Sequence, residues 1–231
     1  MGLPNDYDAF AAAYAADNES NAWNAHYERP AMLRLAEPVA GRRVLDAGCG
    51  AGALSEALLE RGAAVTGIDS SRGLLELASG RVGGRAEFRQ GDLAAPLPFA
   101  DGAFDLVVAS LVMHYLRDWE PTLREFHRVL VPGGRLVIST HHPFMDHPLA
   151  GGEDYFATYD FGETWRRGEH EVQMRFWHRP LRAMTRSLAG AGFRLDVVDE
   201  PDPSPEVREL DPRAWRSLTS EPRYIFLAAG R

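Results

Sequence analysis

Short apolar segments alternate with segments of helical periodicity over residues 42–140. Most of the apolar segments lack the polar–apolar alternation that a strand with one exposed face shows. Strands of this kind are typical of a parallel sheet that helices cover on both faces. We therefore predict an α/β fold. The expected strands are 42–48, 63–69, 86–92, 104–111 and 135–140, and the expected helices are 52–62, 70–80 and 121–130.

The remaining sequence adds elements to this core and contains two segments that depart from the alternation. A helix is expected at 179–192 and strands at 193–200 and 223–229. Residues 1–40 have a helical pattern and precede the first strand. Residues 141–179 separate the fifth strand from the next helix, and two strand-like stretches within them could form a hairpin.

The composition disfavours nucleic-acid binding and an oxidising compartment. The net charge is −8 and the pI about 5.5, so no overall positive field attracts a phosphate backbone. Cys49 is the one cysteine, which excludes an intrachain disulfide. No apolar run approaches the roughly 20 residues of a spanning helix, and the first residues do not resemble a signal peptide. We expect a cytoplasmic protein, and the use of Arg for every basic residue indicates a bacterial one.

A glycine-rich loop lies between the first expected strand and its helix, in the stretch "VLDAGCGAGALSEAL". Glycines at such a turn let a ligand approach the backbone closely, and the spacing also fits the loose dinucleotide pattern G-x-G-x-x-G/A. Asp46 distinguishes the two ligand types, because its carboxylate would repel a pyrophosphate placed at Gly48. A ligand with a cationic centre and an ammonium group, such as S-adenosylmethionine, would be favoured instead.

Two further aspartates end the next two expected strands. Asp69 lies 21 positions after Gly48, close to the spacing of a carboxylate that binds a ribose diol. Asp92 ends the third expected strand, where a carboxylate can accept the amino hydrogens of adenine. A single aspartate at a strand end often serves only to cap a turn. Three at consecutive strand ends indicate a nucleoside site.

Four successive motifs resemble those of class I S-adenosylmethionine-dependent methyltransferases. They are "VLDAGCGAGALS", "VTGIDSS", "QGDLAAPLPFADGAFDLVVASLVMHYL" and "EFHRVLVPGGRLVIST". The chain is most similar to the bacterial ubiquinone/menaquinone-type and natural-product small-molecule methyltransferases. The resemblance implies a Rossmann-like sheet of seven strands in the order 3-2-1-4-5-7-6, with the last strand antiparallel. It further implies one domain, 1–231, with its cofactor-binding core at 42–140 and the rest of the sheet at 180–231.

The resemblance also implies a set of cofactor-binding residues. The methionine end is expected at Asp46 and the 48–52 loop, the ribose at Asp69, the adenine at Asp92 and the sulfonium near Ser110. Cys49 is interpreted as a small buried residue of the loop. The cofactor-binding candidates are Tyr14, Arg29, Asp46, Gly48, Cys49, Gly50, Asp69, Ser70, Asp92, Leu93 and Ser110.

The acceptor is expected to be a small molecule bound under two lid segments, the helical residues 1–40 and the insertion 141–179. Both segments are rich in aromatic residues, which indicates a pocket for a flat or apolar molecule, although packing of the lids onto the core explains such residues equally well. The stretch "SLVM" follows the fourth strand where methyltransferases acting on amide or nucleobase nitrogen carry N/D-P-P-Y/F. Amide and nucleobase nitrogens are therefore disfavoured as acceptors.

Three histidines follow the fifth strand in "LVISTHHPFMDHP". They could bind a metal, stabilise the loop or supply a general base, since imidazole titrates near working pH. Adjacent side chains of an extended chain point to opposite sides, which disfavours a metal site. Because Pro143 restricts the backbone of the residue before it, we favour His142 as the base and His141 as structural. His114 is the rival base.

These observations predict methyl transfer from S-adenosylmethionine to a small molecule, with a hydroxyl oxygen as first choice of acceptor and an acidic carbon as second. Two other functions compete with this one. They are a cofactor-binding regulatory module without catalysis and an NAD(P)-dependent oxidoreductase, which Asp46 and Asp92 disfavour. We expect no nucleic-acid, membrane or metal partner, and the sequence leaves a monomer and a homodimer open.

Overall fold

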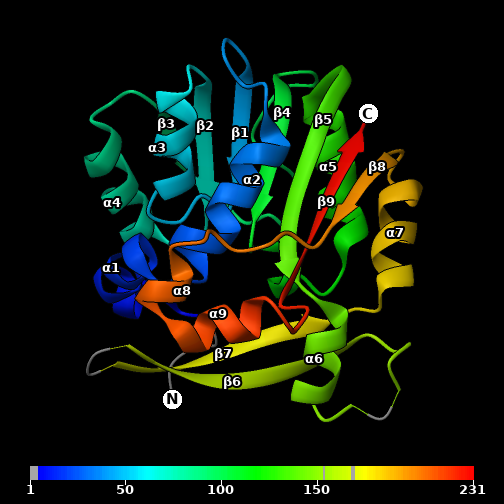
Figure 1. The fold of residues 1–231 in the computed structure, drawn as a ribbon. Coiled ribbons are helices and arrows are strands. Elements are labelled where there is room, and N and C mark those ends of the chain that lie inside the picture. Colours follow the sequence, from blue (N-terminus) through cyan, green and yellow to red (C-terminus); the bar gives the residue numbers. More distant parts are fainter. Residues whose placement is uncertain (1–4, 153, 168–169) are drawn as a thin grey trace.

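The computed structural model describes residues 5–152, 154–167 and 170–231, and its main element is a seven-stranded sheet (Figure 1). From edge to edge the strands are β3 (Glu87–Gln90), β2 (Ala64–Asp69), β1 (Arg43–Ala47), β4 (Phe104–Ser110), β5 (Leu130–His141), β9 (Tyr224–Gly230) and β8 (Arg194–Asp199). The first five run parallel, and β9 is antiparallel to both of its neighbours. Counted within this sheet, the order is 3-2-1-4-5-7-6, so the predicted topology is confirmed.

Helices bury both faces of the sheet, as the apolar strands predicted. In β4, Val107 packs into the core on one face, and its neighbours Leu106 and Val108 pack into the core on the other. Successive strand residues point to opposite faces, so two covered faces require an apolar residue at every position. The helices α5 (Trp119–Val129) and α7 (Leu181–Gly190) cover one face, and α2 (Arg29–Ala36) and α3 (Ala53–Glu60) cover the other.

One predicted boundary in the core is wrong. We expected the fifth strand to begin at residue 135, after a helix stop at Pro132-Gly133-Gly134, but β5 begins at Leu130. The pairing of β4 with β5 shifts register between Phe104 and Leu106. Pro132-Gly133-Gly134 therefore form an irregular bulge within β5 and do not separate it from the helix. The helix α4 (Arg72–Val82), which follows β2, has Ser71 as its N-cap.

The segments outside the core gather at the end of the sheet where the parallel strands terminate (Figure 1). The predicted hairpin is present as β6 (Tyr159–Arg167) and β7 (His170–His178). Among the described residues before β1, the predicted helical character is found over 7–20 and 24–36. The N-terminal elements are η1 (Tyr7–Phe10), α1 (Ala11–Ser20) and the π-helix η2 (Asn24–Glu28), and the single turn η3 (Met113–Tyr115) follows β4. Three helices were not predicted: α6 (Pro143–Leu149), α8 (Val207–Leu210) and α9 (Pro212–Leu218).

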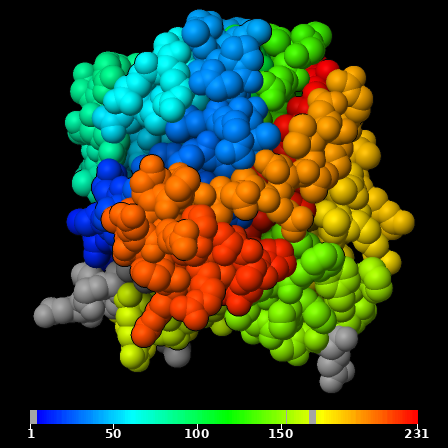
Figure 2. Space-filling view, viewed as in Figure 1, coloured from blue at the N-terminus to red at the C-terminus, as the bar shows by residue number. Residues whose placement is uncertain are grey.

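The C-terminal helices α8 and α9 cover the strand ends from the front. Figure 2 shows their atoms, in orange and red, spread between the N-terminal segment and α6. Their buried residues Val207, Ala214 and Leu218 join the same core as η2 and α2. In the described part of the chain, no helix combines the length and apolar character that crossing a bilayer requires.

Candidate functional site

The loop from β1 to α3 has glycines in the left-handed backbone region where the sequence predicted a ligand cradle. Gly48 and Gly50 have φ angles of +77° and +53°. A Cβ on Gly48 would lie 2.5 Å from Cγ2 of Val112, whereas a Cβ on Gly50 would meet no atom within 4 Å. The N–H groups of Gly48 and Cys49 donate to the carbonyl of Ile68 at 2.8 and 3.1 Å. One side of the loop is therefore fixed against β2 and the other is open. Cys49 is buried, and burial raises the pKa of its thiol, which fits the structural role expected of it.

Asp46 is the penultimate residue of β1, just before this loop, and its carboxylate is fully buried. Its Oδ2 accepts a 2.6 Å hydrogen bond from the Ser55 hydroxyl, while its buried Oδ1 has no partner among the described residues. Burial, with smaller contributions from the charges of Asp69 and Glu28, raises the pKa of Asp46 to about 7. A buried acceptor without a donor is costly, so the site is suited to a ligand that brings a hydrogen-bond donor or a positive charge.

Glu28 is a second buried carboxylate at this site, and the sequence analysis did not find it. Its side chain reaches from η2 to the ends of β4 and β5, where Oε1 accepts hydrogen bonds from Ser110 at 2.7 Å and Ser139 at 2.5 Å. Burial raises the pKa of Glu28. Asp46 and Glu28 both line a cavity of about 80 Å³, together with Arg29 and the glycine loop.

Asp69 connects β2 to the glycine loop. Its Oδ2 accepts from the N–H of Gly50 and its Oδ1 from the N–H of Ser71, both at 2.9 Å. Burial raises the pKa of Asp69, and these backbone donors oppose that increase. The carboxylate thus fixes the loop and still faces a second cavity, of about 240 Å³.

The second cavity brings together the residues expected around the ribose and adenine. Asp92 accepts the N–H of Ala94 through Oδ1 at 2.8 Å, and the buried Leu93 accepts the Thr122 hydroxyl through its carbonyl at 2.8 Å. The predicted cofactor-binding residues that line this cavity are Tyr14, Gly48, Gly50, Asp69, Ser70, Asp92, Leu93 and Ser110. Their proximity fits the predicted site, and their individual roles stay predictions.

The N-terminal segment covers the cavities of about 80 and 240 Å³, which we call the donor-side cavities because the residues predicted to bind the methyl donor line them. Asp8 accepts from the Ser71 hydroxyl at 2.5 Å and from the N–H of Gly73 at 2.8 Å, which holds η1 against the start of α4. Tyr14 lines both donor-side cavities. Arg29 lines the smaller one, and its guanidinium donates to the carbonyl of Asn18 at 2.9 Å.

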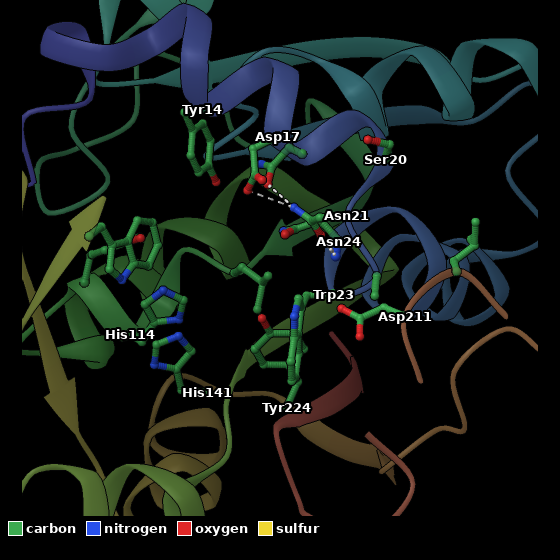
Figure 3. A pocket seen from close by; sticks show the side chains of 16 residues that line it. Tyr14, Asp17, Ser20, Asn21, Trp23, Asn24, His114, His141, Asp211 and Tyr224 are labelled. Carbon is green, nitrogen blue, oxygen red and sulfur yellow. Dashed lines mark hydrogen bonds between the residues drawn. The ribbon is translucent and has the colours of Figure 1, made fainter. Parts of the chain in front are cut away.

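A third and larger cavity, of about 670 Å³, lies next to these two and shares Tyr14 and Leu111 with both. Its walls come from α1, η2, β5, β6 and the C-terminal helices, and Figure 3 shows Tyr14 and Asp17 on one side with Trp23 and Tyr224 on another. Leu111 has a φ of +46°, which is unusual for a residue with a side chain. The backbone at the junction of the three cavities is therefore strained.

Two histidines lie side by side on the wall of the large cavity (Figure 3). The rings of His114 and His141 stack with centroids 3.8 Å apart. Burial, with a smaller effect of His141, holds the pKa of His114 well below its usual range, so His114 is neutral. The Nδ1 of His141 lies 3.2 Å from Oδ1 of the buried Asp146 on α6.

The structure places His141, and not His142, at the large cavity, and which of them acts as a base stays a prediction. His142 is the N-cap of α6: its Nδ1 accepts from the N–H of Phe144 at 3.2 Å, and its Nε2 lies 3.0 Å from Oε1 of Glu200. It does not line the large cavity, whereas His141 does. The two side chains do diverge as expected, but the unpredicted helix α6 turns His142 away and leaves His141 on the wall of the large cavity.

The third histidine of this stretch also points elsewhere, because Nδ1 of His147 pairs with the Tyr159 hydroxyl at 2.8 Å. Among residues 5–152, 154–167 and 170–231, no three histidine, cysteine or acidic side chains converge in a way that could hold a metal ion. That the protein needs no metal stays a prediction.

Comparison with known proteins identifies the core of the chain. Residues 45–138 match the family described as "Methyltransferase domain". A crystal structure of an S-adenosylmethionine-dependent methyltransferase from Mesorhizobium loti superposes with a TM-score of 0.70 at 25% identity, covering 87% of this chain and 96% of that one. Residues 45–138 therefore form a methyltransferase domain, and the fold of the chain is that of S-adenosylmethionine-dependent methyltransferases.

Two curated relatives in this family differ in their acceptors. The demethylmenaquinone methyltransferase of Clavibacter sepedonicus is 40% identical over 135 residues, which cover 57% of this chain and 55% of the relative. The malonyl-[acyl-carrier protein] O-methyltransferase of Serratia marcescens is 32% identical over 169 residues, covering 73% and 60%. The chain thus spans little more than half the length of these relatives. The family match at 45–138 contains the glycine loop and all three aspartates, whereas most of the large cavity's wall lies outside it.

Proposed function

We propose that this protein transfers a methyl group from S-adenosylmethionine to a small molecule bound in the 670 Å³ cavity. The observation that carries the proposal is the unpartnered, buried Oδ1 of Asp46 under an open glycine loop, beside a cavity that Asp69 and Asp92 line. Bound S-adenosylmethionine supplies an electrophilic methyl group on a sulfonium centre. The chain's own residues bind the donor and hold the acceptor in line with it.

The donor-side residues fit that cofactor by charge and by shape. Asp46 offers an acceptor to an ammonium group, and Arg29 in the same cavity offers a guanidinium to the adjoining carboxylate. Asp69 would receive ribose hydroxyls, and Asp92 the adenine amino group. A dinucleotide is disfavoured, since a pyrophosphate at the glycine loop would meet Asp46 and Glu28 without a compensating cation on the loop itself.

The acceptor is proposed to be flat and uncharged or cationic. The wall of the large cavity combines Trp23, Trp165 and Tyr224 with the carboxylates of Asp17 and Asp211. In the described part of the chain, no arginine lines it, although the protein has 25 basic residues. An anionic acceptor would therefore lack a partner charge there.

A hydroxyl oxygen is our first choice of acceptor atom, because a base lies on the cavity wall. We assign that role to His141 in place of His142. The Asp146 carboxylate beside Nδ1 favours a proton on that nitrogen and leaves Nε2 to accept one from the acceptor. His114, buried and neutral, supports the ring of His141 by stacking. An acidic carbon is the second choice, since it too needs a base.

Calorimetry and a transfer assay test the proposal. S-Adenosylhomocysteine should bind the wild-type protein with micromolar-class affinity and raise its melting temperature, whereas NADH should do neither. Transfer is then measured with isotopically labelled donor over a panel of phenols, alcohols, amines and acidic carbon compounds. Tight NADH binding without binding of S-adenosylhomocysteine would sink the proposal. Donor binding without transfer to any compound would favour the non-catalytic module.

A further inference from the structure

We propose that Glu28 is a second carboxylate of the donor site and receives the donor's ammonium group together with Asp46. The inference rests on the proposed function, because it needs S-adenosylmethionine as the ligand. It assigns a ligand contact to η2, an element outside the residues 45–138 that match the methyltransferase family.

The two oxygens of Glu28 have different surroundings. Oε1 accepts both serine hydroxyls, from Ser110 and Ser139, and from the described residues Oε2 receives no hydrogen bond. The side chain is 3% exposed and lines the 80 Å³ cavity, as does Asp46 with its unpartnered Oδ1. One oxygen of each carboxylate thus remains without a donor at the same small cavity.

Two carboxylates at one small buried cavity need a cation. Burial disfavours the ionised form of each carboxylate, and the charge of Glu28 adds to this effect on Asp46. Arg29 is the one arginine that lines this cavity among the described residues, and its guanidinium already donates to the carbonyl of Asn18. An α-amino acid brings an ammonium group with three N–H donors next to a carboxylate. The ammonium matches Asp46 and Glu28, and the carboxylate matches Arg29.

A Glu28→Gln substitution separates this role from a structural one. The amide oxygen of Gln can still accept from Ser110 and Ser139, so the connection between η2 and the ends of β4 and β5 is preserved. The amide NH₂ group of Gln then takes the place of Oε2, and it cannot accept a hydrogen bond from an ammonium. A structural role therefore predicts little change, whereas a ligand contact predicts a large one.

The experiment compares two ligands that differ in the amino-acid part. S-Adenosylhomocysteine carries the ammonium and carboxylate, and 5′-methylthioadenosine lacks both but keeps the adenosine. Calorimetry with wild type and Glu28→Gln should show about a 10- to 100-fold weaker affinity of the variant for S-adenosylhomocysteine, as for a lost hydrogen bond to a charged group. Affinity for 5′-methylthioadenosine should not change. Glu76→Gln on α4, where the glutamate is exposed and paired with Arg72, is the matched control.

The outcomes separate clearly. An equal loss for both ligands would show that Glu28 only supports the fold, and no loss for either would show that it does not face the ligand; both overturn the inference. Wild-type protein that binds neither ligand overturns the proposed function and the inference with it, and the wild-type titration alone reveals that case. If Glu28→Gln is not folded by circular dichroism, Glu28→Asp replaces it. This variant keeps the charge but withdraws it by one methylene, and the same ligand-specific loss is expected.

Discussion

The two sides of the proposed site are built in different ways: the donor-side cavities and the cavity of about 670 Å³ proposed for the acceptor, called the acceptor-side cavity below. The donor-side cavities are lined by the loops that follow β1, β2, β3 and β4, together with residues of the N-terminal segment. The loops are joined by hydrogen bonds such as those of Asp69 to Gly50 and Ser71. The acceptor-side cavity is walled by segments that are far apart in the sequence, from Tyr14 on α1 to Tyr224 on β9. Most of the first region falls within the family match, and most of the second lies outside it.

This difference separates what the fold determines from what the individual chain determines. Loops after parallel strands converge at one edge of any such sheet, so one sheet geometry provides the donor site. The acceptor wall depends on side chains of the lid elements, which can vary without disturbing the sheet. Substitutions on the two sides should therefore change different quantities: donor affinity on one side and turnover on the other.

The largest effect is expected on the acceptor side. His141→Ala should lower turnover with a hydroxyl acceptor by about 10²–10⁴-fold, the usual contribution of a general base. Donor affinity should stay near wild type, because His141 does not line the donor-side cavities. Single-turnover rates with labelled donor, together with calorimetry of S-adenosylhomocysteine, measure both quantities. A variant that turns over like wild type would show that the acceptor needs no base from this residue.

The sequence predicted the donor side far better than the acceptor side. Strands such as β4 can be recognised from local apolar runs. Asp46, Asp69 and Asp92 lie at or close to the ends of strands whose neighbours the family resemblance implied. These contacts depend on residues near in sequence or on a common topology. The five core strands and the convergence of the three aspartates on two adjoining cavities could therefore be predicted from the sequence.

Glu28 and the histidine pair show why the rest could not. The hydrogen bonds of Glu28 reach Ser110 and Ser139, 82 and 111 positions away, and nothing in the sequence around Glu28 marks it as a site residue. For His141 and His142 the divergence was predicted, but the choice between them depended on α6. That helix contains Pro148, and a proline within such a short helix obscures its pattern.

On the donor side, Asp69→Ala should weaken the binding of S-adenosylhomocysteine by about 1.5–3 kcal/mol, the scale of hydrogen bonds to a charged group. Part of the loss comes from the glycine loop, because Gly50 loses the acceptor of its N–H group. Trp165→Ala, on the wall of the large cavity, should leave this affinity unchanged. Calorimetry on both variants checks the expectation, and equal losses would remove the distinction between the two sides.

The pH dependence of donor binding should follow Asp46. Burial raises its pKa from 3.8 to about 7, so the carboxylate of the free protein becomes ionised as the pH rises through 7. An ammonium group binds the ionised form, so affinity for S-adenosylhomocysteine should fall by about tenfold from pH 8 to pH 6. The same shift should make unfolding easier as the pH rises between 4 and 7, since the folded state holds that proton more tightly.

Asp46→Asn isolates this contribution. The variant cannot titrate at residue 46, so its affinity should be weaker than that of wild type and should depend less on pH over the same interval. Calorimetry at pH 6, 7 and 8 provides the comparison. An unchanged pH profile in the variant would assign the dependence to another group, with Glu28 as the next candidate because burial also raises its pKa.

The smallest effect is expected at His142, which lines neither the donor-side cavities nor the acceptor-side cavity. Its imidazole caps α6 by accepting the N–H of Phe144, so His142→Ala should lower the free energy of unfolding by about 1 kcal/mol, the usual cost of losing an N-cap. Any change in donor affinity or turnover should be no larger than the smaller folded fraction of the variant explains. Urea unfolding and the transfer assay on one preparation measure both. A large loss of turnover in a folded His142→Ala protein, with His141→Ala near wild type, would mean that His142 is the base, as the sequence analysis predicted. The capping geometry would then have to break when the acceptor binds.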